Sequence, residues 1–321
     1  MNITTGPSNQ QDLPAMIELL RSSLGEGLIP KSEAYFIWKH ELNPFGASKV
    51  LLAKDGDKIV GLRAFMRWRW VSASEDIVAV RAVDTATDPA YQGKGIFKQL
   101  TLQAAEECKS EGVGLVFNTP NTNSMPGYLK MGWHQAGRMP LYVGPGSLLP
   151  RLYSEKIVQQ LLQQYDAASA FDDLTEGWNL APRGTVLQTP ISKQYLMWRY
   201  RDCPIVKYGA IIESGKFGIV FRMKKLNRFV ELRICELWTE QKGADAKARK
   251  AYRKLLRSLR PVMVSCGPSP LFETKHKRPL GLLGPFKKGP ETTLKPLAKQ
   301  KLNNFDGFLQ WSPSIGTMEL F

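Results

Sequence analysis

The chain has 321 residues, of which 43% are hydrophobic, and a formal net charge of +15 at pH 7. This length allows one large domain or two ordinary ones, and the scattered glycines and prolines argue against a disordered chain. A basic surface attracts polyanions, which include nucleic acid, anionic membranes, acidic glycans and phosphorylated cofactors. The densest cationic stretches are 224–228, 247–260 and 275–278, and an ordinary solvated surface is the simpler explanation of each.

Cysteine and histidine usage excludes several classes of protein. The four cysteines form no Cys-x-x-Cys pair and the three histidines are isolated, so we expect neither a metal site nor a disulfide framework. Residues 1–11 lack an apolar signal core, and no apolar run is long enough to cross a bilayer. We therefore expect a cytoplasmic protein without a transmembrane segment.

The sequence up to residue 87 predicts two helices and three strands. Apolar residues recur at helical spacing in 12–24, and a second helix over 33–42 is ended by Asn43-Pro44. Residues 49–71 are typical of two strands around the turn Asp55-Gly56-Asp57, and 77–85 are typical of a third strand.

The stretch DPAYQGKGIFKQL (88–100) follows the third strand. Within and beyond it, Ile96, Leu100, Ala104 and Cys108 recur every four residues and predict the buried face of a helix that ends at Gly112. VGLVFN (113–118) then predicts a short buried strand, and 126–131 a brief helix. The predicted fold class is α/β in its mixed α+β form, with a central mixed sheet flanked by helices.

Two distant segments resemble each other. SEAYFIWKHELNP (32–44) and SKQYLMWRYRDCP (192–204) share Ser, Tyr, Trp, a basic residue and Pro at the same spacing, and an apolar strand pair follows each. This pattern predicts an internal duplication: a first domain over 1–143, a connector with a helix over 144–182, and a second domain over 183–321. The alternative is that the tryptophans are core aromatics of unrelated helices.

The loop 92–98 has the composition of a phosphate site. Gly93 and Gly95 allow close backbone approach, the helix that follows offers unpaired N–H groups, and Lys94 and Lys98 add positive charge. Two familiar phosphate motifs fail, because nothing fits the P-loop pattern and Lys98 stands where the dinucleotide fingerprint needs its third glycine. A glycine-rich turn without a ligand is the simple alternative.

The surroundings of this loop, residues 84–133, resemble the central motif of the GNAT acyltransferase superfamily. That motif is Gln/Arg-x-x-Gly-x-Gly/Ala at the end of the fourth strand, and Gln92, Gly93 and Gly95 fit it. The preceding TDPAY is similar to the family's Val-x-Pro-x-Tyr, and the later YLKMGW (128–133) to its Tyr-x-Lys-x-Gly-Phe. The upstream strand pair, which contains Gly61, also fits.

Two features depart from the family pattern. Phe97 stands where the motif has Gly or Ala, so its ring must point away from the phosphates or reshape the pocket. In the second half, RFVELRICELW (228–238) is compatible with the fourth strand and 244–259 with the following helix, but the residues between them lack the motif. We therefore expect a degenerate second GNAT-like domain that does not bind coenzyme A by this route.

The resemblance implies an acyl-CoA, expected to be acetyl-CoA, as cosubstrate and direct transfer of its acyl group to an amine. It implies that backbone N–H groups near Thr85 to Thr87 polarise the thioester carbonyl and that Tyr128 protonates the leaving thiolate. The cosubstrate-binding residues implied are Thr85, Ala86, Thr87, Gln92, Gly93, Lys94, Gly95, Ile96, Phe97, Lys98, Asn118 and Asn123. The ordinary alternatives are a packing role for Tyr128 and a loop role for the asparagines.

The general base is left open. The position where some relatives carry a glutamate on the fourth strand holds Arg81, so Asp84 is the candidate catalytic carboxylate, with a strand-end hydrogen bond as its alternative role. Glu75, Asp76 and His134 are weaker candidates.

These inferences predict an N-acetyltransferase that modifies a primary amine of a small or carrier-linked acceptor. The exposed-looking RWRW (67–70) and the basic charge favour an anionic acceptor such as a nucleotide-linked amino sugar. A non-catalytic module that senses acyl-CoA or binds polyanions is the alternative, and no motif for reading nucleic acid is present. A tandem transferase that uses aminoacyl-tRNA is a third candidate, which the intact loop argues against. The acceptor, the acyl chain length and the oligomeric state stay open.

Overall fold

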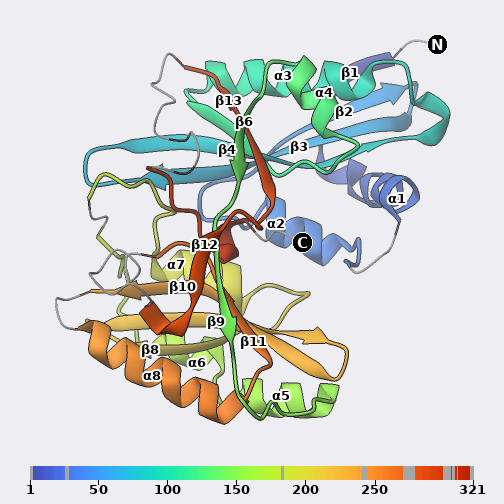
Figure 1. Cartoon of the computed structure of the whole chain (residues 1–321). Coiled ribbons are helices and arrows are strands. Elements are labelled where there is room, and N and C mark those ends of the chain that lie inside the picture. The colour runs from blue at the N-terminus through green and yellow to red at the C-terminus, as the bar shows by residue number, and fades with distance from the viewer. Residues whose placement is uncertain are drawn as a thin grey trace. The chain divides into compact units, whose positions relative to one another are not determined.

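The computed structural model describes residues 3–25, 29–181, 184–240, 244–269, 279–298, 305, 308 and 310–318 (Figure 1). The chain forms two compact units. Unit 1 comprises 1–136, 203–205 and 291–306, and unit 2 comprises 137–202, 206–290 and 307–321. The predicted α/β class with mixed sheets flanked by helices is confirmed. The predicted domain boundaries at residues 143 and 182 stay a prediction. The cationic stretch 275–278 lies outside the described residues.

Unit 1 is built on a seven-stranded sheet of order β1-β2-β3-β4-β5-β13-β6. Strands β1 to β4 pair antiparallel, β4 pairs parallel with β5, and β13 pairs antiparallel with β5. The elements are β1 (Ile3–Pro7), η1 (Gln10–Asp12), α1 (Leu13–Leu24), α2 (Glu33–His40), β2 (Lys49–Asp55), β3 (Lys58–Val71), β4 (Asp76–Thr87), η2 (Pro89–Tyr91), α3 (Ile96–Ser110), β5 (Leu115–Asn118), α4 (Met125–Lys130), β6 (His134–Arg138) and β13 (Glu291–Pro296).

The alternation of β3 corrects one expectation. Trp68 and Trp70 are buried, and Trp70 packs edge-on against Phe117 of β5. Successive side chains of a strand point to opposite faces, so Arg67 and Arg69 lie on the other side, where they pair with Glu111 and Asp76. The expectation of an exposed RWRW surface for an anionic acceptor is therefore wrong, because the two tryptophans belong to the core.

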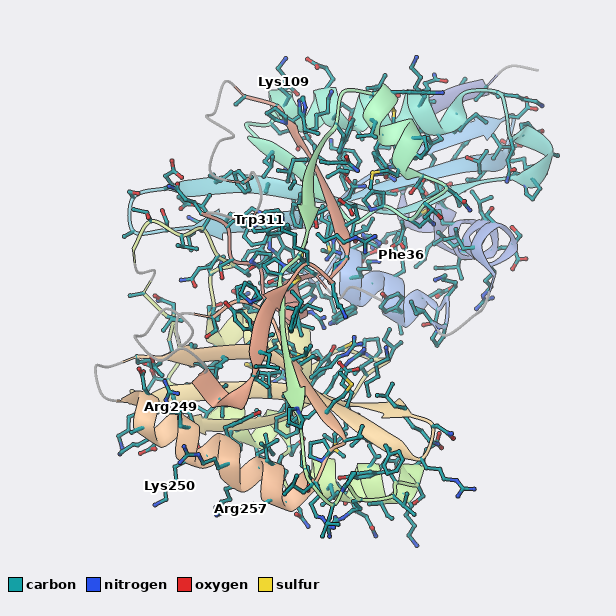
Figure 2. All side chains as sticks on the ribbon, viewed as in Figure 1. Phe36, Lys109, Arg249, Lys250, Arg257 and Trp311 are labelled. Carbon is teal, nitrogen blue, oxygen red and sulfur yellow. The ribbon has the colours of Figure 1, made fainter. Side chains whose placement is uncertain are left out.

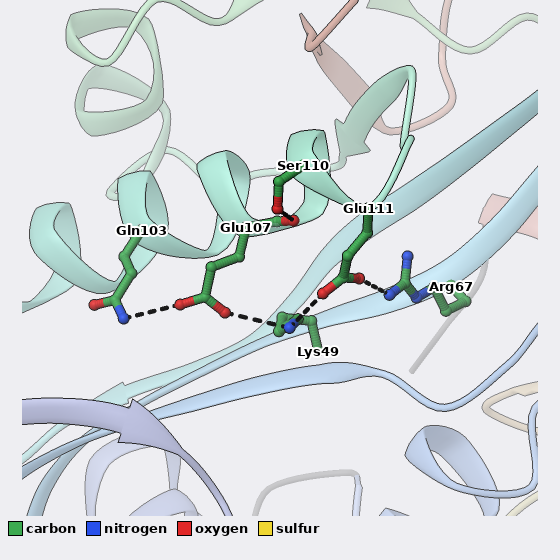
Figure 3. Close-up of polar contacts among 6 residues, drawn as sticks. All are labelled: Lys49, Arg67, Gln103, Glu107, Ser110 and Glu111. Atoms are coloured by element: carbon green, nitrogen blue, oxygen red, sulfur yellow. Dashed lines mark hydrogen bonds and ion pairs between the residues drawn. The ribbon is translucent and has the colours of Figure 1, made fainter.

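A polar network holds α3 against the sheet at the end away from the glycine loop (Figure 3). Lys49 of β2 pairs with Glu107 at 3.2 Å and with Glu111 at 2.5 Å, and Glu111 also pairs with Arg67. The hydrogen bond from Lys49 lowers the pKa of Glu111. Near the other end of α3, a β-carbon on Gly61 would lie 2.5 Å from Ile96, so glycine there lets the helix approach β3 closely.

Unit 2 has a six-stranded sheet of order β12-β7-β11-β10-β9-β8. Helix α8 buries one face against this sheet, where Ala248, Tyr252 and Leu255 join the core cluster. The elements are β7 (Leu141–Pro145), α5 (Glu155–Gln163), α6 (Ala167–Asp172), α7 (Lys193–Leu196), the π-helical turn η3 (Met197–Arg201), β8 (Gly209–Glu213), β9 (Phe217–Leu226), β10 (Phe229–Thr239), α8 (Ala244–Leu259), β11 (Met263–Cys266), η5 (Pro279–Gly281), β12 (Leu283–Phe286) and α9 (Ile315–Met318).

The two sheets share a strand pattern. In each, three antiparallel strands lead into a parallel partner reached through a long helix: β2-β3-β4 and β5 in unit 1, and β8-β9-β10 and β11 in unit 2. The similar segments 32–44 and 192–204 begin alike, because Ser32 and Ser192 cap their helices by accepting hydrogen bonds from the amides of Tyr35 and Tyr195. These likenesses support the predicted duplication.

Candidate active site

The middle of β4 is bulged. In the ladder with β3, Arg63 lies opposite Thr85 and Phe65 opposite Ala82, so two residues of β4, Val83 and Asp84, face one residue of β3. Such an extra residue bends a strand and redirects its backbone groups. Strand β4 pairs with β5 only through residues 79–81, so the edge of β4 beyond residue 81 is not covered by β5.

This uncovered edge carries the predicted carbonyl-polarising residues. Thr85, Ala86 and Thr87 still pair with β3 on their other side, and the amide of Asp88 donates to Val60 O at 3.0 Å. Because successive amides of a strand point in opposite directions, those of Thr85 and Thr87 face away from β3. Thr85 and Thr87 are half-exposed, so a ligand can reach this edge.

The glycine loop joins β4 to α3 in left-handed conformations. Gly93 and Gly95 have φ of 76° and 79°, and Gly95 is the N-cap residue directly before α3. A β-carbon on either glycine would meet nothing within 4 Å, so the loop faces open space rather than packed protein. Gln92, Lys94 and Lys98 are exposed, whereas Ile96 is buried and anchors the helix. The N–H groups of a first helical turn have no intrahelical partner, so an anion would find them available here.

The turn before the loop is held by side chains. Asp88 accepts a hydrogen bond from the amide of Ala90 at 2.8 Å and pairs with Lys58 at 2.7 Å. Tyr91 donates to Asp55 at 2.9 Å, and the ammonium of Lys94 lies 4.4 Å from the centre of the Tyr91 ring. These contacts hold η2 in its conformation, so the start of the loop is fixed without a bound ligand.

Tyr128 and Phe97 meet beside the loop. Tyr128, on α4, is buried, and its ring packs edge-on against Phe97 with centroids 5.5 Å apart. The Phe97 side chain thus extends toward α4 and away from the loop glycines, which is one of the two arrangements expected from its departure from the motif. The roles of both residues in binding acyl-CoA stay predictions.

Arg63 is the unexpected member of this cluster. Its side chain is completely buried, and its Nη2 donates a hydrogen bond to the hydroxyl of Tyr128 at 2.7 Å. Its Nε and Nη1 have no hydrogen-bond partner among the described residues, and its guanidinium lies 4.9 to 5.8 Å from the ring centres of Phe65, Tyr128 and Phe97. A buried cation with so few partners is costly, which makes Arg63 a candidate functional residue.

Asp84, in the bulge, is held by α2. Lys39 approaches its carboxylate at 2.9 Å and His40 Nε2 at 2.8 Å, while His40 Nδ1 lies 2.9 Å from the hydroxyl of Ser48. Burial would raise the pKa of Asp84, but the charge of Lys39 and the hydrogen bonds from His40 and Lys39 lower it. Burial lowers the pKa of His40 despite the opposing effect of Asp84. A neutral His40 therefore donates from Nε2 to an ionised Asp84, and Nδ1 accepts from Ser48.

The asparagines have different surroundings. Asn118, at the end of β5, is buried, and its Oδ1 accepts a hydrogen bond from Thr293 of β13 at 2.7 Å. Asn121 accepts from the amides of Asn123 and Ser124 and so orders the start of α4. The side chain of Asn123 is exposed, which leaves it accessible to a ligand.

Sequence reasoning missed Arg63, Lys39 and His40. Arg63 was hidden in an apolar strand segment, although the alternation of β3 puts it on the same face as Gly61 and Phe65, toward α3. Lys39 and His40 lie in the helix predicted over 33–42, and the pairing of His40 with Asp84 depends on a contact across 44 residues of sequence.

Comparisons with known proteins agree with the fold. Residues 6–136 match the family model of the acetyltransferase (GNAT) domain. A search of curated protein sequences found no match. The fold is shared with a probable N-acyltransferase of Enterococcus faecalis, with a TM-score of 0.64 and 10% identity over 92% of this chain and 73% of that one. It is also shared with GCN5-related N-acetyltransferases of Anabaena variabilis and Kribbella flavida, with TM-scores of 0.62 and 0.58, 12% identity each, and coverage of 92% of this chain and 73% and 71% of theirs. The chain therefore carries a GNAT domain over residues 6–136 and has the GNAT fold.

Proposed function

We propose that this protein is an acyl-CoA-dependent N-acyltransferase that uses acetyl-CoA and transfers its acetyl group to a primary amine. The observation that carries the proposal is the left-handed glycine loop at the start of α3, next to the uncovered edge of β4. A pyrophosphate fits the exposed amides and cations of residues 92–98. The acceptor is a small or carrier-linked amine, with amino sugars among the candidates.

Transfer requires a polarised thioester carbonyl and a proton for the leaving thiolate. The amides of Thr85 and Thr87 face the uncovered edge, where they can donate to the carbonyl oxygen. The neutral amine nitrogen attacks the carbonyl carbon, the carbon–sulfur bond breaks, and Tyr128 gives its proton to the sulfur. Arg63 donates to the Tyr128 oxygen, so it fixes the position of the hydroxyl that gives the proton. We assign Arg63 as a positioning residue for Tyr128.

Asp84 is the weaker part of the proposed chemistry. An acid with a lowered pKa, already bonded to Lys39 and His40, is a poor proton acceptor. We propose that Asp84 holds the bulge in place, and that the proton of the incoming amine leaves through water. Unit 2 is proposed to be a diverged copy that shapes or stabilises the protein and does not bind acyl-CoA through its own loop.

The test is isothermal titration of acetyl-CoA into wild type, Gly95→Asp and Gly112→Asp. The control is matched, because Gly112 ends the same helix with φ of 82° and, like Gly95, has nothing within 4 Å of an added β-carbon. A carboxylate at 95 should abolish binding, whereas the control should bind like wild type. If a folded wild type binds neither acetyl-CoA nor longer acyl-CoAs, the proposal fails. Binding without thiol release over a broad panel of amines would instead favour an acyl-CoA sensor.

A further inference from the structure

The loop between β7 and α5 exposes three leucines that no part of the proposed function uses. Leu148 is 99% exposed, Leu149 72% and Leu152 58%. Single exposed apolar residues are normal on protein surfaces, but a group of large ones at the tip of one loop marks an interaction site. The loop carries no acidic residue between Gly146 and Ser154.

This leucine loop, residues 146–153, is fixed to two other elements of unit 2. The amide of Arg151 donates to Arg260 O at 3.0 Å, and Arg260 Nε donates to Leu149 O at 2.7 Å, so the loop lies against the end of α8. The amide of Tyr153 donates to Arg228 O at 2.8 Å, which brings the tip of the β9–β10 hairpin to the same place. The leucines are therefore held outward on an ordered base.

Both neighbouring elements are strongly basic. On α8, Lys250, Arg253, Lys254 and Arg257 are exposed and spaced three or four residues apart, so they form one stripe along the helix. Figure 2 shows Lys250 and Arg257 projecting from α8. The hairpin tip adds the exposed Lys224, Lys225 and Arg228. Residues 224–230 and 246–260 contain no Asp or Glu, so the stripe and the hairpin tip have no acidic neighbour within their own segments.

We propose that this surface, the leucine loop with the basic stripe and the hairpin tip, binds the face of a bilayer that contains anionic phospholipids. Leucine side chains gain by entering the acyl boundary, while lysine and arginine attract the anionic headgroups around them. A duplex nucleic acid needs the cations only, and single strands are bound by stacking on aromatic rings, which the loop does not present outward because its one aromatic, Tyr153, is buried. The combination of protruding leucines and cations therefore favours lipid.

Binding of this kind is peripheral. Among the described residues, none of the helices has both the length and the apolar character that crossing a bilayer requires. The apolar face of α8 is already packed in the core of unit 2. In this proposal the helix attracts the anionic headgroups, and the leucines of the loop insert into the bilayer. The inference stands apart from the proposed acyl transfer and uses none of its residues.

The experiment is flotation of the full chain with two kinds of vesicle, pure phosphatidylcholine and phosphatidylcholine with a minority of phosphatidylglycerol. We expect binding to the anionic vesicles alone, weakened by salt. Leu148→Ser/Leu149→Ser and Arg253→Gln/Arg257→Gln should each weaken it by about tenfold or more. The controls are Leu42→Ser, a leucine 62% exposed in unit 1, and Lys109→Gln, which should bind like wild type.

Folding of each variant is checked by its melting temperature, which should not change. Equal binding of wild type to both vesicle types would overturn the proposal. So would a leucine variant that floats like wild type while the arginine variant does not, because this pattern reports charge attraction alone. A parallel titration with duplex DNA completes the test: tighter binding to DNA than to anionic vesicles, indifferent to the leucines, would assign the surface to nucleic acid.

Discussion

Strands β4 and β10 occupy the same place in their sheets, and each has a bulge with a carboxylate in or beside it. Asp84 lies in the bulge of β4, and Glu236 follows Cys235, the extra residue of the β10 bulge. His40 contacts Asp84, and Tyr200 donates to Glu236 at 2.6 Å. His40 and Tyr200 stand at matching positions of the similar segments 32–44 and 192–204. Both the bulge and the contact from the preceding helical segment to its carboxylate thus occur in each unit. This repetition favours a structural role for Asp84.

The two carboxylates differ in their partners and in the direction of their pKa shifts. Asp84 pairs with Lys39, which lowers its pKa. Glu236 accepts from three hydroxyls, those of Tyr195, Tyr200 and Ser314 at 3.1, 2.6 and 2.8 Å, and burial raises its pKa. One bulge is therefore held by an ion pair and the other by hydrogen bonds from neutral groups.

The two strands also differ in access. Residues 83–85 of β4 are half-exposed, whereas 234–238 of β10 are buried. The C-terminal segment packs against β10, where Arg199 donates twice to Gly316 O and a β-carbon on Gly316 would lie 1.8 Å from the hydroxyl of Tyr200. A cavity of about 60 Å³ remains beside Glu236. A β-bulge thus lies at an accessible strand edge in unit 1 and in the packed core in unit 2.

The largest expected effect on activity comes from substituting one of the two buried tyrosines, Tyr128 and Tyr200. Tyr128→Phe keeps the ring packing but removes the proton donor, so kcat should fall by roughly a hundredfold or more with KM little changed. Tyr200→Phe should leave kcat unchanged and lower the melting temperature, because it removes a hydrogen bond to Glu236. Steady-state kinetics and thermal unfolding of both variants give the comparison. A large loss of kcat in Tyr200→Phe would show that unit 2 takes part in the chemistry.

The two buried arginines should also separate function from stability. Arg199 is well bonded, to Gly316 and Tyr208, so Arg199→Met should cost about 2–4 kcal/mol of unfolding free energy by leaving these acceptors unpaired. Arg63→Met removes a poorly paired buried charge, so stability should hold or rise, while kcat falls about tenfold. A destabilised Arg63→Met with normal kcat would make Arg63 a structural residue.

The bulge carboxylates should respond oppositely to pH. The folded pKa of Asp84 is lowered, so its stabilisation is present above its unfolded pKa of about 3.9 and is lost as the pH falls. The folded pKa of Glu236 is raised, so its contribution is present below about pH 4.3 and is lost as the pH rises through the folded value. Asp84→Asn should therefore cost about 2 kcal/mol at neutral pH, and Glu236→Gln less than about 1 kcal/mol.

Urea unfolding of both variants below about pH 4 and at neutral pH measures these differences. Activity per folded molecule decides the catalytic question for Asp84. A kcat reduced more than about a hundredfold in a stable Asp84→Asn would make Asp84 the general base after all.

The smallest effect concerns the network on α3. Glu111→Gln removes the pairs with Lys49 and Arg67, and exposed or half-exposed pairs contribute less than about 1 kcal/mol each. The loss should shrink further in salt. Glu106→Gln, which removes only the loose pair with Lys109 at 3.7 Å, is the matched control and should be silent. Chemical unfolding at low and high salt tests both variants.

Much of unit 1 was predictable from local pattern. Helical and strand periodicities located α1, α2, α3 and the strands β2 to β4, because amphipathic elements carry their period in the sequence itself. The glycine loop was predicted in the same way, since left-handed backbone and close approach both require glycine. The repeat at 32–44 and 192–204 predicted a second sheet. Neither segment predicts which later strands pair at the edges of its sheet.

Only the tertiary structure decided which strands finish each sheet and which groups surround the site. β13 pairs with β5, more than 170 residues earlier, and β7 pairs with β11. The partners of Arg63 and Asp84 likewise lie 65 and 44 residues away in the chain. Local sequence encodes period, turn chemistry and motif spacing, but burial and hydrogen-bond partnership arise from contacts between distant segments, which a single chain's pattern does not record.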